Sequence, residues 1–295
     1  DEEEGENNNR RTLEKLHISL PINEKNTYFP DILMKLMYQS ATVLELQNVS
    51  SLSADCSFGN FQQLDLRGTE VEIDSLTTAF SHSLLIDQLK ISHLNPPKLA
   101  NLVIEKNITL RALTVAEGNI PLHDIATIIE RQNTLLVCDF SDYRPPTSID
   151  SLSFTSKNLK CNLEMFLAPF DDGVSTFESF PLWRQIIDDN CSTLELIDAS
   201  RNSELSLYLL QRLIKSPSNF PQLKGIHLDF TPEITQFLSD NIEALKNTAL
   251  EELIIPGLDA SNKSDYTLDL REECMKYNVK CKAENNPGAA TYFDI

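Results

Sequence analysis

The chain has 295 residues, 41% of them hydrophobic, and a formal charge of −19 at pH 7, because 44 acidic residues outnumber 25 Lys and Arg. This charge disfavours nonspecific binding to nucleic acids and anionic membranes, since contacts to phosphate need Lys and Arg. No long apolar run and no signal-peptide pattern occurs, so we expect an intracellular protein, cytoplasmic or nuclear, with neither nucleic-acid nor membrane contacts.

The chain begins with a predicted disordered acidic tail, residues 1–11. It has no apolar residue that can pack, and five of its first six residues are acidic. A solvated linker and an acidic docking segment for a basic partner both remain open.

An apolar spacing, L-x-x-L-x-L, recurs along residues 12–258. It is clearest where Leu194, Ile197 and Ala199 precede Asn202, whose side chain can bond backbone groups in a turn. Neighbouring sets mostly start about 20 to 29 residues apart, which is typical of a repeat protein. The sets start at Leu13, Ala41, Phe61, Ile86, Leu110, Leu135, Ile149, Leu194, Leu223 and Leu250.

Between these sets the apolar period becomes that of a helix. Pro121 suits the first turn of one helix, and Thr231 with Pro232 suits the N-cap of another. Each unit is therefore predicted as a strand followed by a helix, and neighbouring units must stack, because one unit cannot bury its own apolar face. The helical faces are Phe29–Met37, Ile73–Phe80, Leu122–Ile129, Leu205–Leu213 and Ile234–Leu245.

In this spacing the chain resembles the long-repeat branch of the leucine-rich-repeat superfamily, of the ribonuclease-inhibitor-like and F-box-like type. The resemblance covers Leu13 to about Ile255 and implies an α/β solenoid, a horseshoe with a parallel concave sheet and convex helices. Only Asn202 matches the family's Asn well, so the array is divergent. Other units have Val49, Thr69, Leu94, Gly118 and Tyr143 at that position.

Two regions depart from the repeat. Residues 161–190 form an irregular, aromatic excursion within the array that includes Phe166 and Phe170. Its aromatic residues either cap the helix layer or project as an exposed loop that anchors a partner. Residues 259–295 are predicted as the C-terminal cap and tail, with a last helix over residues 266–277.

The sequence contains no motif for catalysis or for a cofactor. Its eight glycines form no phosphate-binding loop, and neither G-x-S-x-G nor H-E-x-x-H occurs. The six cysteines are irregularly spaced and none pairs with a histidine at ligand spacing, so we expect reduced, mostly buried thiols and no metal. The sequence predicts a protein that is not an enzyme.

The alternation of strand residues predicts a concave face with an excess of acidic residues. We expect its carboxylates to be exposed, to lie in rows and to attract a basic partner, although an acidic protein has acidic faces in any case. The predicted partner-binding residues are Glu45, Asp65, Arg67, Lys90, Asp139, Asp198, His227 and Asp229, with Phe166 and Phe170 from the excursion.

The sequence thus predicts a non-catalytic scaffold or adaptor that binds a protein through the concave face and the 161–190 excursion. One form that the resemblance allows is a substrate-recognition part of a larger complex. The alternative is a direct regulator of an enzyme, either an inhibitor or a GTPase-activating protein. For the latter, Arg67 and Arg201 near strand ends would supply the arginine that acts on the GTPase.

Overall fold

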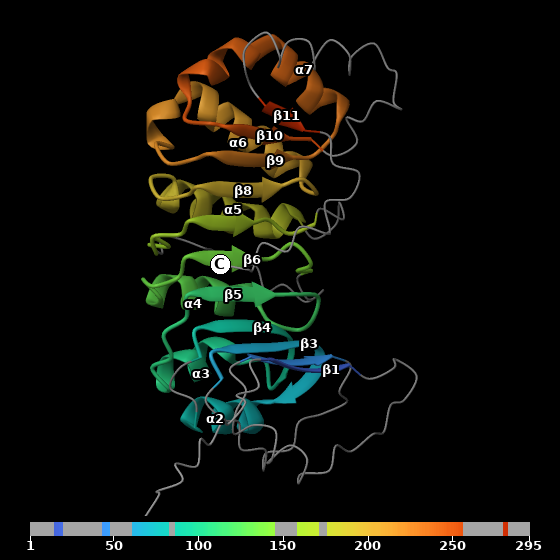
Figure 1. Cartoon of the computed structure of the whole chain (residues 1–295), viewed down its shortest axis with the longest axis vertical. Helices are drawn as coiled ribbons and strands as arrows, with labels where there is room; N and C mark the ends of the chain where they lie inside the picture. Colours follow the sequence, from blue (N-terminus) through green and yellow to red (C-terminus); the bar gives the residue numbers. More distant parts are fainter. Residues whose placement is uncertain are drawn as a thin grey trace, which may run out of the picture.

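Figure 1 shows the chain in a computed structural model. The structure describes residues 15–19, 43–47, 61–82, 86–144, 158–170, 176–255 and 280–282. The acidic tail at residues 1–11, the predicted helices near Phe29 and at residues 266–277, and the apolar set that begins at Ile149 lie outside the described residues.

The described strands form a single parallel sheet of eleven strands whose order in the sheet is their order in the sequence. Parallel neighbours must be joined by a crossover, which is usually a helix. The predicted α/β class with one parallel sheet is therefore confirmed. The strands are β1 (Lys15–Ser19), β2 (Val43–Gln47), β3 (Gln63–Glu72), β4 (Gln88–Asn95), β5 (Ala112–Val115), β6 (Val137–Asp139), β7 (Met165–Leu167), β8 (Leu196–Ala199), β9 (Gly225–Leu228), β10 (Glu252–Ile254) and β11 (Lys280–Lys282).

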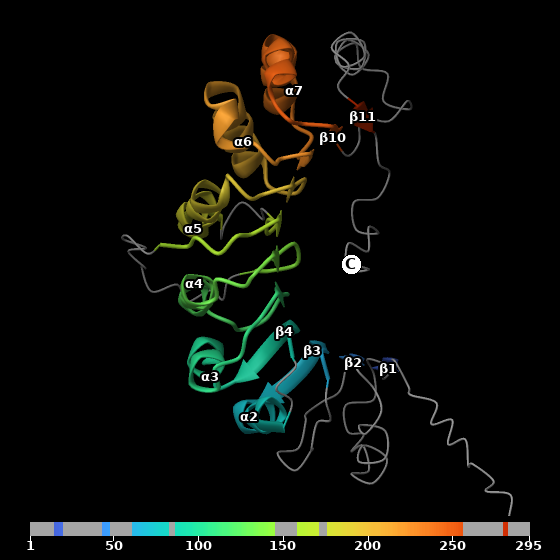
Figure 2. The same ribbon diagram turned by 60° about the vertical axis from the view of Figure 1, so that its left-hand side comes forward.

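The helices lie together on one side of the sheet (Figure 2). Among the described residues no helix covers the opposite side, which we call the helix-free face. The helices are α2 (Ile73–His82), α3 (Leu99–Glu105), α4 (Leu122–Arg131), α5 (Thr176–Asn190), α6 (Ser203–Lys215) and α7 (Pro232–Asn241), with short 3-10 turns at Pro217–Asn219 and Ile242–Asn247.

Alternate strand residues form the core between the sheet and the helices. Leu64 and Leu66 of β3 are 1% and 0% exposed, as the repeated spacing predicts. The predicted N-cap Thr231 is also confirmed, since its Oγ1 accepts the Ile234 N–H at 3.2 Å. Asn202, predicted to bond backbone groups in a turn, accepts the Leu205 N–H with its Oδ1 at 2.9 Å and caps α6. Repeat spacing and capping residues therefore position most of the elements.

Buried side-chain amides connect two of the turns before strands to the equivalent turn of the preceding unit. Gln132 accepts the Leu110 N–H at 3.0 Å and donates to the Ile108 carbonyl at 2.7 Å. Asn190 has the equivalent role ahead of β8, accepting the Cys161 N–H and donating to the Leu159 carbonyl, both at 2.9 Å. Buried backbone groups need hydrogen-bond partners, and these amides supply them to N–H and C=O groups in turns outside the β-sheet.

The described residues of the predicted irregular excursion, 161–170 and 176–190, supply a strand and a helix of the array, so its interpretation as a departure from the repeat is wrong. It contains β7, which pairs in register with β6 and β8, and the helix α5. Leu163, Phe166 and Ala168 have the repeat spacing and are 0%, 0% and 6% exposed. Phe and Ala replace the leucines here, and this substitution concealed the repeat in the sequence.

Phe166 belongs to a buried aromatic cluster, so its predicted exposure is wrong. Its ring centroid lies 6.2 Å from that of Phe140 and 6.3 Å from that of Trp183 in α5. Tyr143 completes the cluster 6.1 Å from Trp183 and donates its hydroxyl to the Ile120 carbonyl at 2.9 Å. These aromatic side chains fill the space between sheet and helices.

We predict that Leu66→Ala lowers the free energy of unfolding by about 2–5 kcal/mol, because a fully buried side chain leaves a cavity. Ile104→Ala is the matched control, since Ile104 is 42% exposed on α3 and its truncation leaves no cavity. Urea unfolding followed by circular dichroism measures both. Equal, small losses for the two variants would contradict the register of β3.

Candidate functional site

One row of side-chain positions crosses the helix-free face from strand to strand. The ladder register aligns Glu45 with Asp65, Asp65 with Lys90, and Asp198 with His227. Asp139 lies in the same row, between Thr114 of β5 and Leu167 of β7. The register therefore brings together six of the residues that the sequence singled out.

The remaining predicted residues of this face lie outside that row. Arg67 is two residues beyond Asp65 on β3, and Asp229 is two residues beyond His227, just past the end of β9. Glu252, another acidic residue expected on the face, aligns with Gly225 in the adjacent row. The row is also less acidic than expected, because Lys15 forms a 2.7 Å ion pair with Glu45.

The carboxylates of this row are not the exposed charges that the sequence predicted. Asp65, Asp139 and Asp198 are only 4%, 6% and 8% exposed. Each accepts the backbone N–H two residues further along: Arg67 at 3.2 Å, Ser141 at 3.0 Å and Ser200 at 2.9 Å.

Aspartate commonly bonds its own backbone in this way where a chain turns. Asp139 and Asp198 lie where β6 and β8 end, whereas Asp65 precedes the irregularity within β3. A structural role therefore accounts for the position of each.

Different neighbours shift the pKa of two equivalent aspartates in opposite directions. Burial raises the pKa of Asp139, and its hydrogen bonds with Ser141 compensate only in part. Burial also acts to raise the pKa of Asp198, but the hydrogen bond and charge of His227, together with the hydrogen bonds from Ser200, outweigh it and the pKa is lowered. The two atoms of that pair, His227 Nδ1 and Asp198 Oδ2, are 3.2 Å apart, and His227 is 4% exposed.

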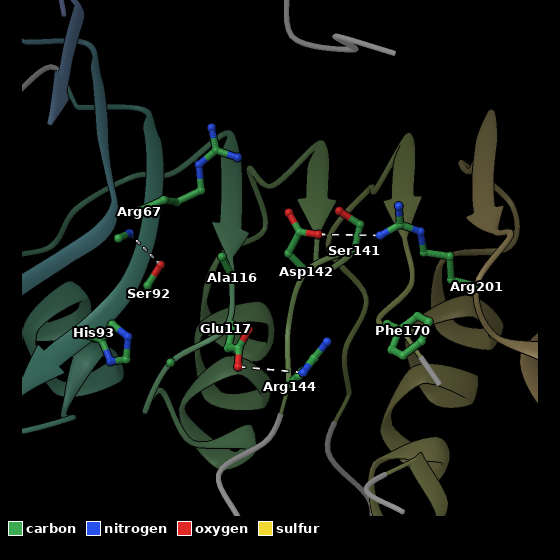
Figure 3. A pocket seen from close by; sticks show the side chains of 12 residues that line it. Arg67, Ser92, His93, Ala116, Glu117, Ser141, Asp142, Arg144, Phe170 and Arg201 are labelled. Carbon is green, nitrogen blue, oxygen red and sulfur yellow. Dashed lines mark hydrogen bonds and ion pairs between the residues drawn. The ribbon is translucent and has the colours of Figure 1, made fainter. Parts of the chain in front are cut away.

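We call a second feature the strand-end groove. It is about 800 Å³ in volume and lies where β3 to β8 end or have just ended (Figure 3). Three arginines from separate strand ends line it, together with the side chain of Phe170, which is 38% exposed. Its residues are Arg67, Gly68, Ser92, His93, Ala116, Glu117, Gly118, Ser141, Asp142, Arg144, Phe170 and Arg201.

Backbone contacts fix the floor of the groove. A Cβ on Gly118 would lie 1.8 Å from the Ser92 carbonyl oxygen, so only glycine allows the loop after β5 to pass this close to β4. Gly68 has a φ of 72° at the irregularity in β3 and donates its N–H to Ser92 Oγ at 3.2 Å. The groove is therefore formed by tightly joined strand ends.

The three arginines of the groove differ in how they are held. Arg67 donates from Nη2 and Nε to the Asp65 carboxylate at 2.8 and 3.0 Å, and this hydrogen bonding raises the pKa of the guanidinium. The contacts of Arg144 with Glu117 and of Arg201 with Asp142 are longer, 3.8 Å each. Arg144 also lies 5.7 Å from the centroid of the Phe170 ring.

Sequence reasoning identified some of the residues of this groove. Arg67 and Phe170 were predicted to bind a partner and Arg201 was considered for the alternative function, and all three line the groove. Arg144, Glu117, Asp142 and His93 were missed. The only signal for them is that they follow or end strands, where the apolar period gives no information.

The described residues hold no group of three or more His, Cys, Asp or Glu that could bind a metal ion. None of the described helices is long and apolar enough to cross a membrane. Cys138 and Cys161 are buried free thiols in the core, and burial raises the pKa of both. Their chemistry is therefore that of unreactive core side chains.

Compared with models of known families and with curated proteins, the sequence matches none of them. The fold and the geometry of its surfaces therefore provide the grounds for a functional assignment.

We predict opposite pH trends for Asp198→Asn and Asp139→Asn. The lowered pKa of Asp198 adds stability above the unfolded-state value of about 3.9, and this stability is lost as the pH falls through the folded-state pKa. Asp198→Asn should therefore lower the free energy of unfolding most near neutral pH and less in acid. The raised pKa of Asp139 has the opposite effect on the free energy of unfolding, which the charged carboxylate lowers as the pH rises. The loss of stability in Asp139→Asn should therefore become smaller as the pH rises.

Urea unfolding of the wild type and both variants between about pH 3 and pH 7 tests this contrast. Each variant is the control for the other, since both lose one carboxylate from the same row. Parallel pH trends would mean that His227 does not distinguish the two sites.

Proposed function

We propose that this chain is a leucine-rich-repeat-type solenoid that works as a non-catalytic protein-interaction scaffold or adaptor. A partner would lie across the helix-free face and reach the strand-end groove. The observation that carries the proposal is a parallel sheet of eleven strands with all described helices on one side. Repeat proteins use extended surfaces of this kind to bind other proteins.

The repeat spacing supports the finer assignment to leucine-rich repeats. Leu64 and Leu66, and equally Ile197 and Ala199, occupy the inner positions of that repeat and are buried. Asn202 fills the family's Asn position and donates its side-chain amide to the Pro169 carbonyl of the preceding unit at 3.2 Å. The horseshoe curvature belongs to the same proposal.

The expected basic surface of the partner stays in the proposal, but three carboxylates of the row contribute less to its attraction than the sequence suggested. Asp65, Asp139 and Asp198 are bound within the chain, so they offer a basic partner less charge than the sequence suggested. Substituting them by Lys would now be expected to damage the fold, because each would lose buried hydrogen bonds. Binding tests on this face should therefore use other positions.

Gln63 and Gln88 provide such positions, since they are partly exposed, adjacent in register and on the helix-free face. We predict that a photo-crosslinking amino acid at either position captures the protein partner in a cell extract. The same amino acid at Glu105 on α3 or Lys215 on α6, both exposed on the helix side, is the control.

One product at the two sheet positions, with a yield several-fold above that at the helix positions, supports the proposal. A product formed mainly from α3 or α6 would place the interaction surface on the helices. Equal yields at all four positions would indicate nonspecific contact and would equally reject the helix-free face.

One observation favours the alternative of a direct enzyme regulator: Arg67 and Arg201 line the same groove. A GTPase-activating protein needs one arginine whose loss abolishes the partner's turnover while binding survives. Arg201 is the better candidate, because Asp65 already holds Arg67 with two hydrogen bonds. Arg201→Ala would separate the functions if a GTPase partner is captured.

A further inference from the structure

The strand-end groove concentrates positive charge on a strongly acidic protein. Arg67, Arg144 and Arg201 line it, against the carboxylates of Glu117 and Asp142. The three arginine side chains are 36%, 52% and 40% exposed, so all can reach a ligand. Elsewhere the chain's charge of −19 repels an acidic ligand, which makes this groove the favoured place for one.

The present ion pairs in the groove are weak enough for a ligand to replace. Arg144–Glu117 and Arg201–Asp142 are 3.8 Å apart, and the two carboxylates are 69% and 63% exposed. Exposed pairs at such distances contribute little to stability, so exchanging them for ligand carboxylates costs little. Arg67 is different, because Asp65 fixes its guanidinium with Nε and Nη2 while other N–H donors remain for a ligand.

The spacing of the arginines fits an extended segment better than a small anion. Arg67 lies on β3, Arg144 follows β6 and Arg201 follows β8. With about 4.8 Å between strands, the arginines are spaced along the sheet by roughly 14 Å and roughly 10 Å. An extended peptide rises about 3.3 Å per residue and alternates the faces of its side chains, so carboxylates on one face that cover this span are about four residues apart.

We propose that the strand-end groove binds an extended acidic peptide segment of a partner protein, with carboxylates about four residues apart on one face of the segment. This inference rests on the proposed function and names the chemistry of one region of its surface. Phe170, 38% exposed beside Arg144, gives an apolar side chain of the segment a contact within the groove. Arg67 and Arg201 bind the two ends of the segment.

Fluorescence anisotropy with a labelled synthetic peptide tests the proposal on the full chain. The peptide has ten residues in a polar background, with glutamate at its second, sixth and tenth positions and one leucine between them. Two comparison peptides carry glutamine in place of glutamate, or the same three glutamates placed side by side. We predict saturable binding of the spaced peptide that weakens as salt rises, because screening reduces the attraction of exposed charges.

Arg144→Gln and Arg201→Gln should each weaken binding of the spaced peptide by about fivefold to tenfold, through the loss of charge-assisted hydrogen bonds. Arg131→Gln on α4 is the matched control, since it removes the same charge from the exposed helix side and should leave the affinity unchanged. Unchanged thermal unfolding would show that the substitutions act on binding alone.

Several results would overturn the proposal. These are no saturable binding, equal affinity for the glutamine peptide, equal affinity for the clustered peptide, or equal loss of affinity in Arg131→Gln. Displacement by inorganic phosphate at millimolar concentration or by a single-stranded oligonucleotide would assign the groove to another ligand. Binding that requires deletion of residues 1–11 would assign it to the chain's own acidic segment.

These results are separable from failure of the scaffold proposal. Cross-linking from Gln63 and Gln88 reports on the helix-free face whether or not a peptide binds in the groove.

Discussion

The constraint on which this structure depends is that no strand–helix unit can bury its own apolar side. Leu64 and Leu66 are removed from water only because neighbouring strands and the helix layer enclose them. The polar groups follow the same rule, since Gln132 and Asn190 satisfy backbone groups of the unit before their own. Apolar and polar interactions thus both act between units, which makes the sheet continuous and leaves one of its faces without helices.

That arrangement separates the structural charges from those available to a ligand. Within the sheet, Asp65, Asp139 and Asp198 accept the backbone N–H two residues on, and they are nearly buried. Beyond the strand ends the constraint of the ladder is absent, and the contacts of the exposed arginines Arg144 and Arg201 with the described carboxylates of Glu117 and Asp142 are long. Recognition chemistry is therefore expected at the strand ends as well as on the sheet.

Much of the fold could be predicted from the sequence because burial produces periodicity. Leu66 fits the strand repeat and Thr231 fits a helix cap, and both predictions are confirmed. The β7 unit was missed because Phe166 and Ala168 stand where leucines are expected and a competing set begins at Ile149. The face of a strand residue could be predicted, but its exposure could not, since exposure depends on local hydrogen bonds.

The sequence analysis overlooked a second recurring pattern: an aspartate followed two residues later by Ser or Arg occurs within β3 and at the ends of β6 and β8. The strand-end groove was only partly predictable, because its residues come from loops more than 20 residues apart and meet only through the stacking of units.

The central claim, that stability passes only between neighbouring units, is tested most directly by hydrogen exchange of Phe166→Ala followed by mass spectrometry. Losing Phe166 removes the centre of the cluster formed with Phe140 and Trp183. The account predicts a graded loss of amide protection, largest in β6, β7, β8 and α5 and smallest in β3, β4 and β10. A uniform loss of protection along the whole chain would contradict it, because it would mean that the protein unfolds as one indivisible core.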